Sequence, residues 1–215
     1  MLQTRERLIT IYTPKINIKI VLVSQKQLHF TMRIIRKWQI GLHNYILQKK
    51  LSAHKVTRYP KGFDEAQSIG ILFDATDPQE RQIVKHYASF IEKKGKNVQL
   101  FAFLNDEQVQ NNFTFKHFSK KELDWTLKPK DQIIANFINT PFDFLINVYQ
   151  GKNIPLEYIS SLSKAHIRVG PYTDKDNCFD LMIETNEQTD LGYFVKQLEY
   201  FLSRMNSQKH EEAIV

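Results

Sequence analysis

The order of apolar runs and helical stripes along the chain predicts an α/β fold. The clearest stretch is residues 142–172, FDFLINVYQGKNIPLEYISSLSKAHIRVGPY, which contains a strand at 144–148, a helix from Pro155 to about Lys164 and a strand at 167–169. The first of these strands is apolar except for Asn147, as is typical of a strand covered by helices on both faces. A strand, a helix and a strand in this order imply parallel pairing with a right-handed crossover.

A second unit of the same kind occupies residues 68–104. SIGILF at 68–73 is a short apolar strand, a helix follows from Pro78 to about Lys94, and residues 98–104 form the next strand. Later apolar segments predict a last strand and a closing amphipathic helix, which ends near residue 205. We therefore expect one three-layer, Rossmann-like α/β domain over residues 63–206, with a mostly parallel sheet of about five strands, and a polar tail at 207–215.

A basic amphipathic helix precedes this domain. From Arg33 to about His54, apolar residues recur at three- and four-residue spacing, and a linker completes the segment 32–62. Four interpretations of the helix stay open: it packs on the domain, lies on an anionic membrane surface, binds nucleic acid or binds another protein. The residues predicted to contact an anionic partner are Arg33, Arg36, Lys37, Trp38, Lys49 and Lys50.

Residues 1–31 contain one strand-like alternation, at 15–22, with no evident partner strand. A cleaner helical pattern begins at Met32. We interpret residues 1–31 as an N-terminal extension that is either disordered or the product of an upstream start codon. Mass spectrometry of the native N-terminus tests this interpretation.

The net charge of +7 conceals a division of the chain. Residues 1–62 carry 13 Lys and Arg against one acid, for a charge of +12, whereas residues 63–215 carry −5. This asymmetry favours an anionic partner for the basic arm. We expect residues 33–61 to bind a membrane surface or a nucleic acid, with a protein partner as the other option.

The sequence predicts a cytoplasmic protein, peripheral to the membrane if the arm binds lipid. No run approaches the roughly 20 apolar residues of a transmembrane helix. The N-terminus lacks the apolar core of a signal peptide. The single cysteine, Cys178, cannot form an internal disulfide, and the neighbouring Phe179 and Leu181 favour a buried strand thiol.

The motifs of common nucleotide, metal and hydrolase sites are missing. The seven glycines form neither G-x-G-x-x-G nor a P-loop, and there is no G-x-S-x-G. The histidines are scattered, without metal-ligand spacing. We therefore predict no cofactor and no metal, and we name no catalytic residue.

Polar residues that follow the predicted strands are the remaining ligand-binding candidates. The carboxyl ends of parallel strands meet at one edge, where open α/β sheets bind their ligands. Asp77 instead fits the N-cap of the helix that begins at Pro78. The candidates are Asp74 and Thr76 after the first strand, Asn105 and Asp106 after the second, and Tyr149, Gln150 and Lys152 after the strand at 144–148.

Two resemblances follow from these segments. The block at 142–172, ILFDATD at 71–77 and the closing helix resemble an uncharacterised bacterial family, a domain of unknown function, over about residues 32–206. More distantly, the helix and IRVG at 167–170 are similar to the N-terminal acceptor half of heptosyltransferase-like glycosyltransferases. We expect the half that binds the sugar nucleotide in those enzymes to be missing, and the loop after the strand at 68–73 is not glycine-rich as theirs is. The resemblance therefore does not imply sugar transfer by this chain alone.

The leading functional hypothesis is a non-catalytic cytoplasmic binding or adaptor protein whose basic arm contacts an anionic surface or partner. The first alternative is a degenerate transferase-like domain that binds a small anionic or sugar-type ligand at the carboxyl edge of the sheet. The second alternative is association with RNA or the ribosome through the arm. Whether the chain is an enzyme is left open, with a non-enzyme favoured.

Overall fold

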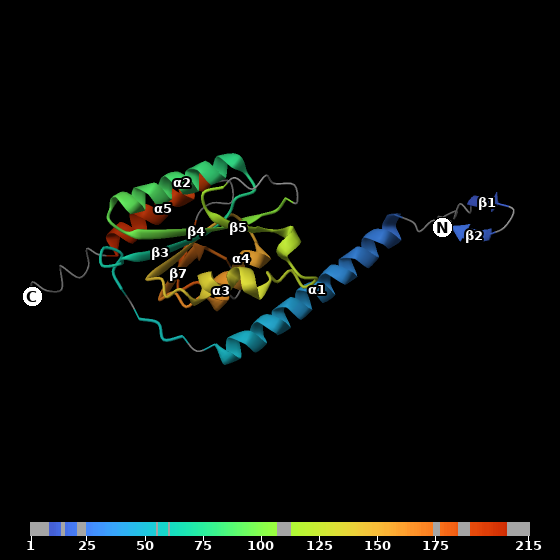
Figure 1. Ribbon diagram of the computed structural model, residues 1–215, viewed down its shortest axis with the longest axis horizontal. Helices are drawn as coiled ribbons and strands as arrows, with labels where there is room; N and C mark the ends of the chain where they lie inside the picture. Colours follow the sequence, from blue (N-terminus) through green and yellow to red (C-terminus); the bar gives the residue numbers. More distant parts are fainter. Residues whose placement is uncertain are drawn as a thin grey trace, which may run out of the picture.

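The computed structural model describes residues 9–13, 16–20, 25–54, 56–59, 61–106, 113–173, 177–184 and 190–205. Within these ranges the chain forms a six-stranded, fully parallel sheet with helices on both faces (Figure 1). The predicted Rossmann-like α/β fold is confirmed, with six strands in place of about five. Its elements are β3 (Ser68–Asp74), α2 (Pro78–Lys93), β4 (Asn97–Leu104), β5 (Lys116–Ser119), the short 3₁₀ helix η1 (Lys120–Glu122), α3 (Asp131–Asn139), β6 (Phe144–Val148), α4 (Ile154–Leu162), β7 (Ile167–Pro171), β8 (Leu181–Ile183) and α5 (Leu191–Arg204).

The strand order places β3 at the centre of the sheet. The order is β5-β4-β3-β6-β7-β8, so the chain builds one half of the sheet outward from β3 and then returns to its other side for β6. If the six strands of this sheet are renumbered from 1 in chain order, the order becomes 3-2-1-4-5-6, which is that of doubly wound folds. The direction of winding reverses between β3 and β6, and the loops after these two strands therefore flank the topological switch point.

The core lies in two layers, one on each face of the sheet. Ile69, Ile71 and Phe73 of β3 pack with the buried faces of α2 and α5. On the other face, Leu72 and Leu145 pack with α3 and α4. All of β6 is buried, which explains its nearly continuous apolar sequence.

Local sequence signals set the ends of the main helices. Asp77 caps α2, as predicted, and Pro78 follows it at the start of the helix. Asn153 caps α4 by accepting a hydrogen bond from Leu156 N at 3.3 Å. Asp190 caps α5 in the same way, through Tyr193 N at 2.7 Å.

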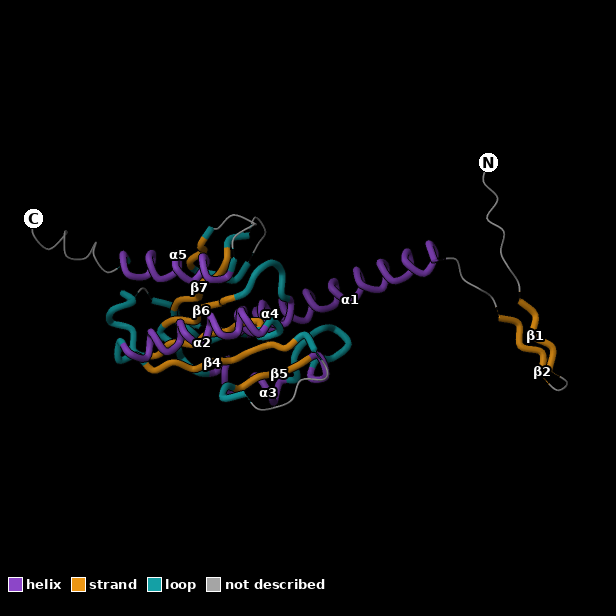
Figure 2. The backbone as a smooth tube through the Cα atoms, turned by 90° about the horizontal axis from the view of Figure 1, so that it is seen from above, coloured by secondary structure: helices purple, strands orange, loops and turns teal. Residues whose placement is uncertain are grey.

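The N-terminal elements differ in extent from the sequence prediction. β1 (Ile9–Thr13) and β2 (Ile16–Ile20) form an antiparallel hairpin, drawn in Figure 2, so the alternation at 15–22 has a partner just before it. α1 (Gln25–Ala53) begins before Met32 and crosses the boundary placed there. The origin of residues 1–31 stays a prediction, and the polar tail at 207–215 lies outside the described residues.

The prediction of a strand thiol is wrong for Cys178. β8 begins only at Leu181, and Cys178 is half-buried in the segment before it. In this segment Phe179, rather than the thiol, packs against the core.

The segment between α1 and β3 is attached to the domain. We call its described residues, 56–59 and 61–67, the strap. The Arg58 guanidinium donates to the carbonyls of Ser163 and Ala165. Lys61 Nζ pairs with Asp143 at 2.8 Å, and the same carboxylate accepts from two backbone amides at the start of β3. These contacts hold the strap against the amino edge of the sheet.

Candidate functional site

The predicted ligand edge is closed by its own hydrogen bonds. Asp74 Oδ1 accepts from the hydroxyl and, at 2.9 Å, from the backbone N of Thr76. Thr76 Oγ1 accepts from Asn105 N at 2.9 Å. Across the switch point, Asn153 Nδ2 donates to Asp74 Oδ2 at 2.9 Å. The fold thus brings Asp74, Thr76 and Asn105 together, and their mutual contacts join the loops after β3, β4 and β6.

The N-terminus of α2 lies at this edge, and the Asp77 carboxylate accepts hydrogen bonds from its free backbone amides. Asp77 Oδ1 accepts from Gln79 N at 2.6 Å and Glu80 N at 3.2 Å. Helix N-termini at this position bind the pyrophosphate in dinucleotide-binding folds. A shallow depression of about 400 Å³ remains beside Asp74, Asp77 and Glu80. Burial, with the two neighbouring carboxylates, raises the pKa of Glu80, and this acidic surface disfavours phosphate.

The other predicted edge residues do not line this depression. Tyr149 is buried in the core layer formed with α3 and α4, where burial raises its pKa well above the ordinary value. Asp106, Gln150 and Lys152 are exposed. In the described ranges, no three His, Cys, Asp or Glu side chains are arranged to hold a metal ion. The edge therefore offers neither a phosphate cradle nor, among the described residues, a metal centre.

One face of α1 is docked on the domain. His43, only 4% exposed, has Nδ1 2.8 Å from Thr126 O, and its ring meets Tyr158 edge to face. Lys50 pairs with Asp131 at 2.8 Å, and this hydrogen bond lowers the pKa of Asp131. Leu47 and Leu51 pack against the core layer formed with α3 and α4. Lys50, predicted to contact an anionic partner, is thus engaged within the protein.

The opposite face of α1 carries exposed apolar side chains. Figures 1 and 2 show the N-terminal half of the helix projecting beyond the α/β domain. Trp38 is 73% exposed and Tyr45 66%, although aromatic side chains normally bury most of their surface. We call these residues the free stripe: Phe30, Ile34, Trp38 and Leu42, which follow one another at four-residue spacing, with Ile35 and Tyr45 beside them.

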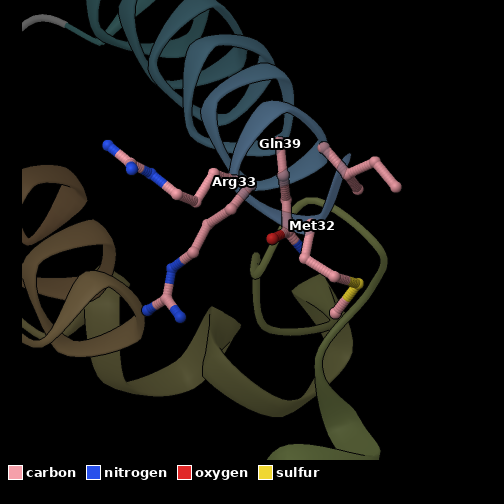
Figure 3. A pocket seen from close by; sticks show the side chains of 5 residues that line it. Met32, Arg33 and Gln39 are labelled. Atoms are coloured by element: carbon pink, nitrogen blue, oxygen red, sulfur yellow. The ribbon is translucent and has the colours of Figure 1, made fainter. Parts of the chain in front are cut away.

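Unpaired cations accompany the free stripe. α1 contains six Lys and Arg residues and no acid. Four of these cations are exposed and form no ion pair with a described residue: Lys49 and, in the projecting half, Arg33, Arg36 and Lys37. Figure 3 shows a shallow depression of about 330 Å³ on this part of the helix, with Arg33 on one side and Met32 and Gln39 on the other. The projecting half of α1 is therefore amphipathic, and all of its charged side chains are Lys or Arg.

The docked face predicts a pH-dependent stability. Burial lowers the pKa of His43 below 6.5, and burial with Lys164, Arg58 and Arg168 does the same for His54. A histidine with a lowered folded-state pKa contributes stability that is complete above about pH 6.5 and is lost as the pH falls toward the folded-state value. We expect the contribution of these two histidines to the free energy of unfolding to fall from pH 7 to pH 5, by at most about 1.4 kcal/mol per pH unit for the buried His43 and by less for the partly exposed His54.

Thermal melts of His43→Gln and His54→Gln measure each contribution. Each substitution should reduce the pH dependence of Tm in this window, because glutamine does not titrate there. Carboxylates with lowered pKa values, such as Asp143, lose their contribution only below the window. An unchanged slope in both variants would contradict the assignment.

The structure thus defines a Rossmann-like α/β protein with a closed ligand edge and a basic, half-exposed N-terminal helix. The chain belongs to DUF6913, a family of unknown function, whose model matches residues 41–205. The match includes the docked half of α1 and the strap, and most of the free stripe precedes it. No curated protein and no solved structure matches the chain.

Proposed function

We propose that this protein is a non-catalytic binding protein that attaches peripherally to an anionic membrane surface through the free stripe of α1. The observation that carries the proposal is a row of exposed aromatic and aliphatic side chains on a helix with six cations and no acid. Helices that lie in the membrane interface combine an apolar face containing Trp, Phe and Leu with a polar face rich in Lys and Arg.

The position of the domain suits this mode of binding. The domain packs on the face of α1 that carries His43 and Leu47, opposite the free stripe. A membrane that meets the stripe therefore encounters the helix before the bulk of the domain. From Phe30 to Tyr45 the stripe runs about 22 Å along the helix axis, at about 1.5 Å per residue. In the described chain, no helix is long and apolar enough to cross a bilayer.

The positive charge of α1 and its apolar stripe together favour an anionic membrane over two other partners, a second copy of α1 and a nucleic acid. A second copy of α1 would bring six further cations to an interface without a single acid of its own. A nucleic acid would bind the cations but leave the apolar stripe exposed, whereas an anionic bilayer takes up both the apolar side chains and the cations beside them. The exposed side chains of the stripe are apolar.

The closed sheet edge supports the non-catalytic part of the proposal. The side chains that the alternative hypothesis assigned to a small anionic ligand already satisfy one another, and the α2 N-terminus holds Asp77. An anionic ligand at this edge would have to displace these contacts beside three acidic side chains.

Vesicle flotation of the full chain tests the proposed function. The three unpaired cations of the projecting half, at about 1 kcal/mol each, predict roughly hundredfold tighter binding to vesicles that contain phosphatidylserine than to phosphatidylcholine alone. Salt should reduce this preference and leave a residual apolar affinity. Filter binding to single-stranded RNA runs in parallel. RNA binding without flotation would replace the proposal with the nucleic-acid hypothesis, and failure of both would exclude each anionic surface.

A further inference from the structure

The second tryptophan of the chain stands exposed at the tip of a loop beside α1. Trp125 is 60% exposed. The loop that bears it runs from Glu122 to Lys130, and its base is closed by a bridge between Leu123 and Pro129 and by a 3.0 Å hydrogen bond from Lys130 N to Glu122 O. We call residues 122–130 the Trp125 loop.

A network centred on one carboxylate fixes the conformation of this loop. Asp124 Oδ1 accepts from the backbone N of Thr126 at 2.8 Å, from the Thr126 hydroxyl at 2.6 Å and from Lys128 N at 3.1 Å. Leu127 takes the left-handed conformation, with φ 62°, which is unfavourable for leucine and persists only where surrounding contacts enforce it. These contacts fix the backbone on both sides of Trp125, whose side chain is exposed.

The Trp125 loop is also bonded directly to α1. Gln39 Nε2 donates to Trp125 O at 2.7 Å, and His43 Nδ1 lies 2.8 Å from Thr126 O. In Figure 3, Gln39 points from the helix toward the yellow-green segment below it. Because both contacts use backbone atoms at the loop tip, the indole is held at a fixed place along the helix.

The base of the loop is basic. Lys120, Lys121 and Lys130 are exposed and form no ion pair with a described residue. The three acids in this part of the chain are already engaged: Glu122 binds the Ser119 amide and hydroxyl in a capping box, Asp124 binds the loop amides, and Asp131 pairs with Lys50. An exposed indole with unpaired lysines at the base of its loop is complementary to a bilayer surface with anionic headgroups.

We infer that the Trp125 loop is a second membrane anchor, which inserts its indole into the interface of the same anionic bilayer while Lys120, Lys121 and Lys130 contact lipid phosphates. This inference rests on the proposed function of α1. The stripe of α1 alone would contact the bilayer along one line, about which helix and domain could roll together. A second anchor, bonded to the helix at Gln39 and His43, fixes that rotation and gives the bound domain one orientation.

The two tryptophans of the chain can be followed separately. Trp38→Phe leaves Trp125 as the only indole, and Trp125→Phe leaves Trp38. With phosphatidylserine-containing vesicles, both proteins should show a shift of emission to shorter wavelength and quenching by lipids brominated on their acyl chains. Emission from Trp125 that neither shifts nor is quenched, while the protein floats with vesicles, would overturn the second anchor and leave the α1 proposal intact.

Affinity provides an independent measurement. Trp125→Ser should weaken vesicle binding about tenfold at unchanged Tm, because the side chain contributes little to the core. Asp124→Ala keeps the indole but removes its positioning network, and it should reduce the quenching of Trp125 in the Trp38→Phe background. Full affinity in Trp125→Ser would contradict the inference. Loss of flotation by the unmodified protein would remove both the inference and the proposed function.

Discussion

A protein carrying Ile34→Ser and Trp38→Ser is expected to lose about a hundredfold of its affinity for phosphatidylserine vesicles. Both side chains are exposed on the projecting half of α1, and neither belongs to either core layer. Their transfer to the membrane interface would contribute on the order of 3 kcal/mol together, which corresponds to this factor. Tm should stay within about 2 °C of the unmodified value, because surface substitutions change stability by about 0.5 kcal/mol or less.

A matched control on the same helix separates apolar contact from helix propensity. Asn44 and Gln48 are exposed and polar. Asn44→Ser with Gln48→Ser introduces the same two serines into α1 and should leave vesicle affinity within about twofold. Equal losses in both double variants would show that the stripe is not the contact surface, and a large drop in Tm of the first variant would show that the stripe packs within the protein.

Asp74→Ala is expected to lower the free energy of unfolding by about 2 kcal/mol, and so to lower Tm by about 4–8 °C. The substitution removes acceptors for Thr76 N, the Thr76 hydroxyl and Asn153 Nδ2, and it separates the loops on the two sides of the switch point. Differential scanning calorimetry measures the change. A ligand-binding role would instead leave the stability of the unliganded protein almost unchanged.

Asn105→Ala is the control at the same edge. Asn105 joins the network through its backbone N, so truncating the side chain preserves that hydrogen bond. We expect a change below about 0.5 kcal/mol. If Asn105→Ala and Asp74→Ala had equal effects on stability, the loop-joining role of the Asp74 carboxylate would be wrong.

The period of the hydrophobic pattern predicted most of the domain. Apolar runs such as 144–148 become buried parallel strands because helices cover both faces of the sheet. The helix predicted from Pro78 buries Val84, Tyr87, Ala88 and Ile91, which recur at helical spacing. Asp77 and Pro78 predicted the start of α2 because a cap is a local interaction. The convergence of Asp74, Thr76 and Asn105 followed from parallel topology alone.

The remaining features depend on contacts that a sequence pattern does not contain. Whether Asp74 faces a ligand or Asn153 depends on a hydrogen bond between residues 79 positions apart. The apolar positions of α1 were recognised, but which of them pack on the domain depends on the placement of Thr126, Tyr158 and Asp131. Trp125 lies outside any periodic apolar pattern. A single aromatic residue in a turn can be buried or exposed, so the sequence did not predict the exposure of this side chain.

The strap has a mechanical consequence. A helix joined to its domain by a slack tether would let the domain tumble above any surface that held the helix. Here Arg58 and Lys61 fasten the tether to the amino edge of the sheet, while His43 and Lys50 fasten the helix itself. Helix and domain therefore move as one rigid body. A force that tilts α1 is transmitted as a torque to the sheet, and the acidic carboxyl edge turns with it.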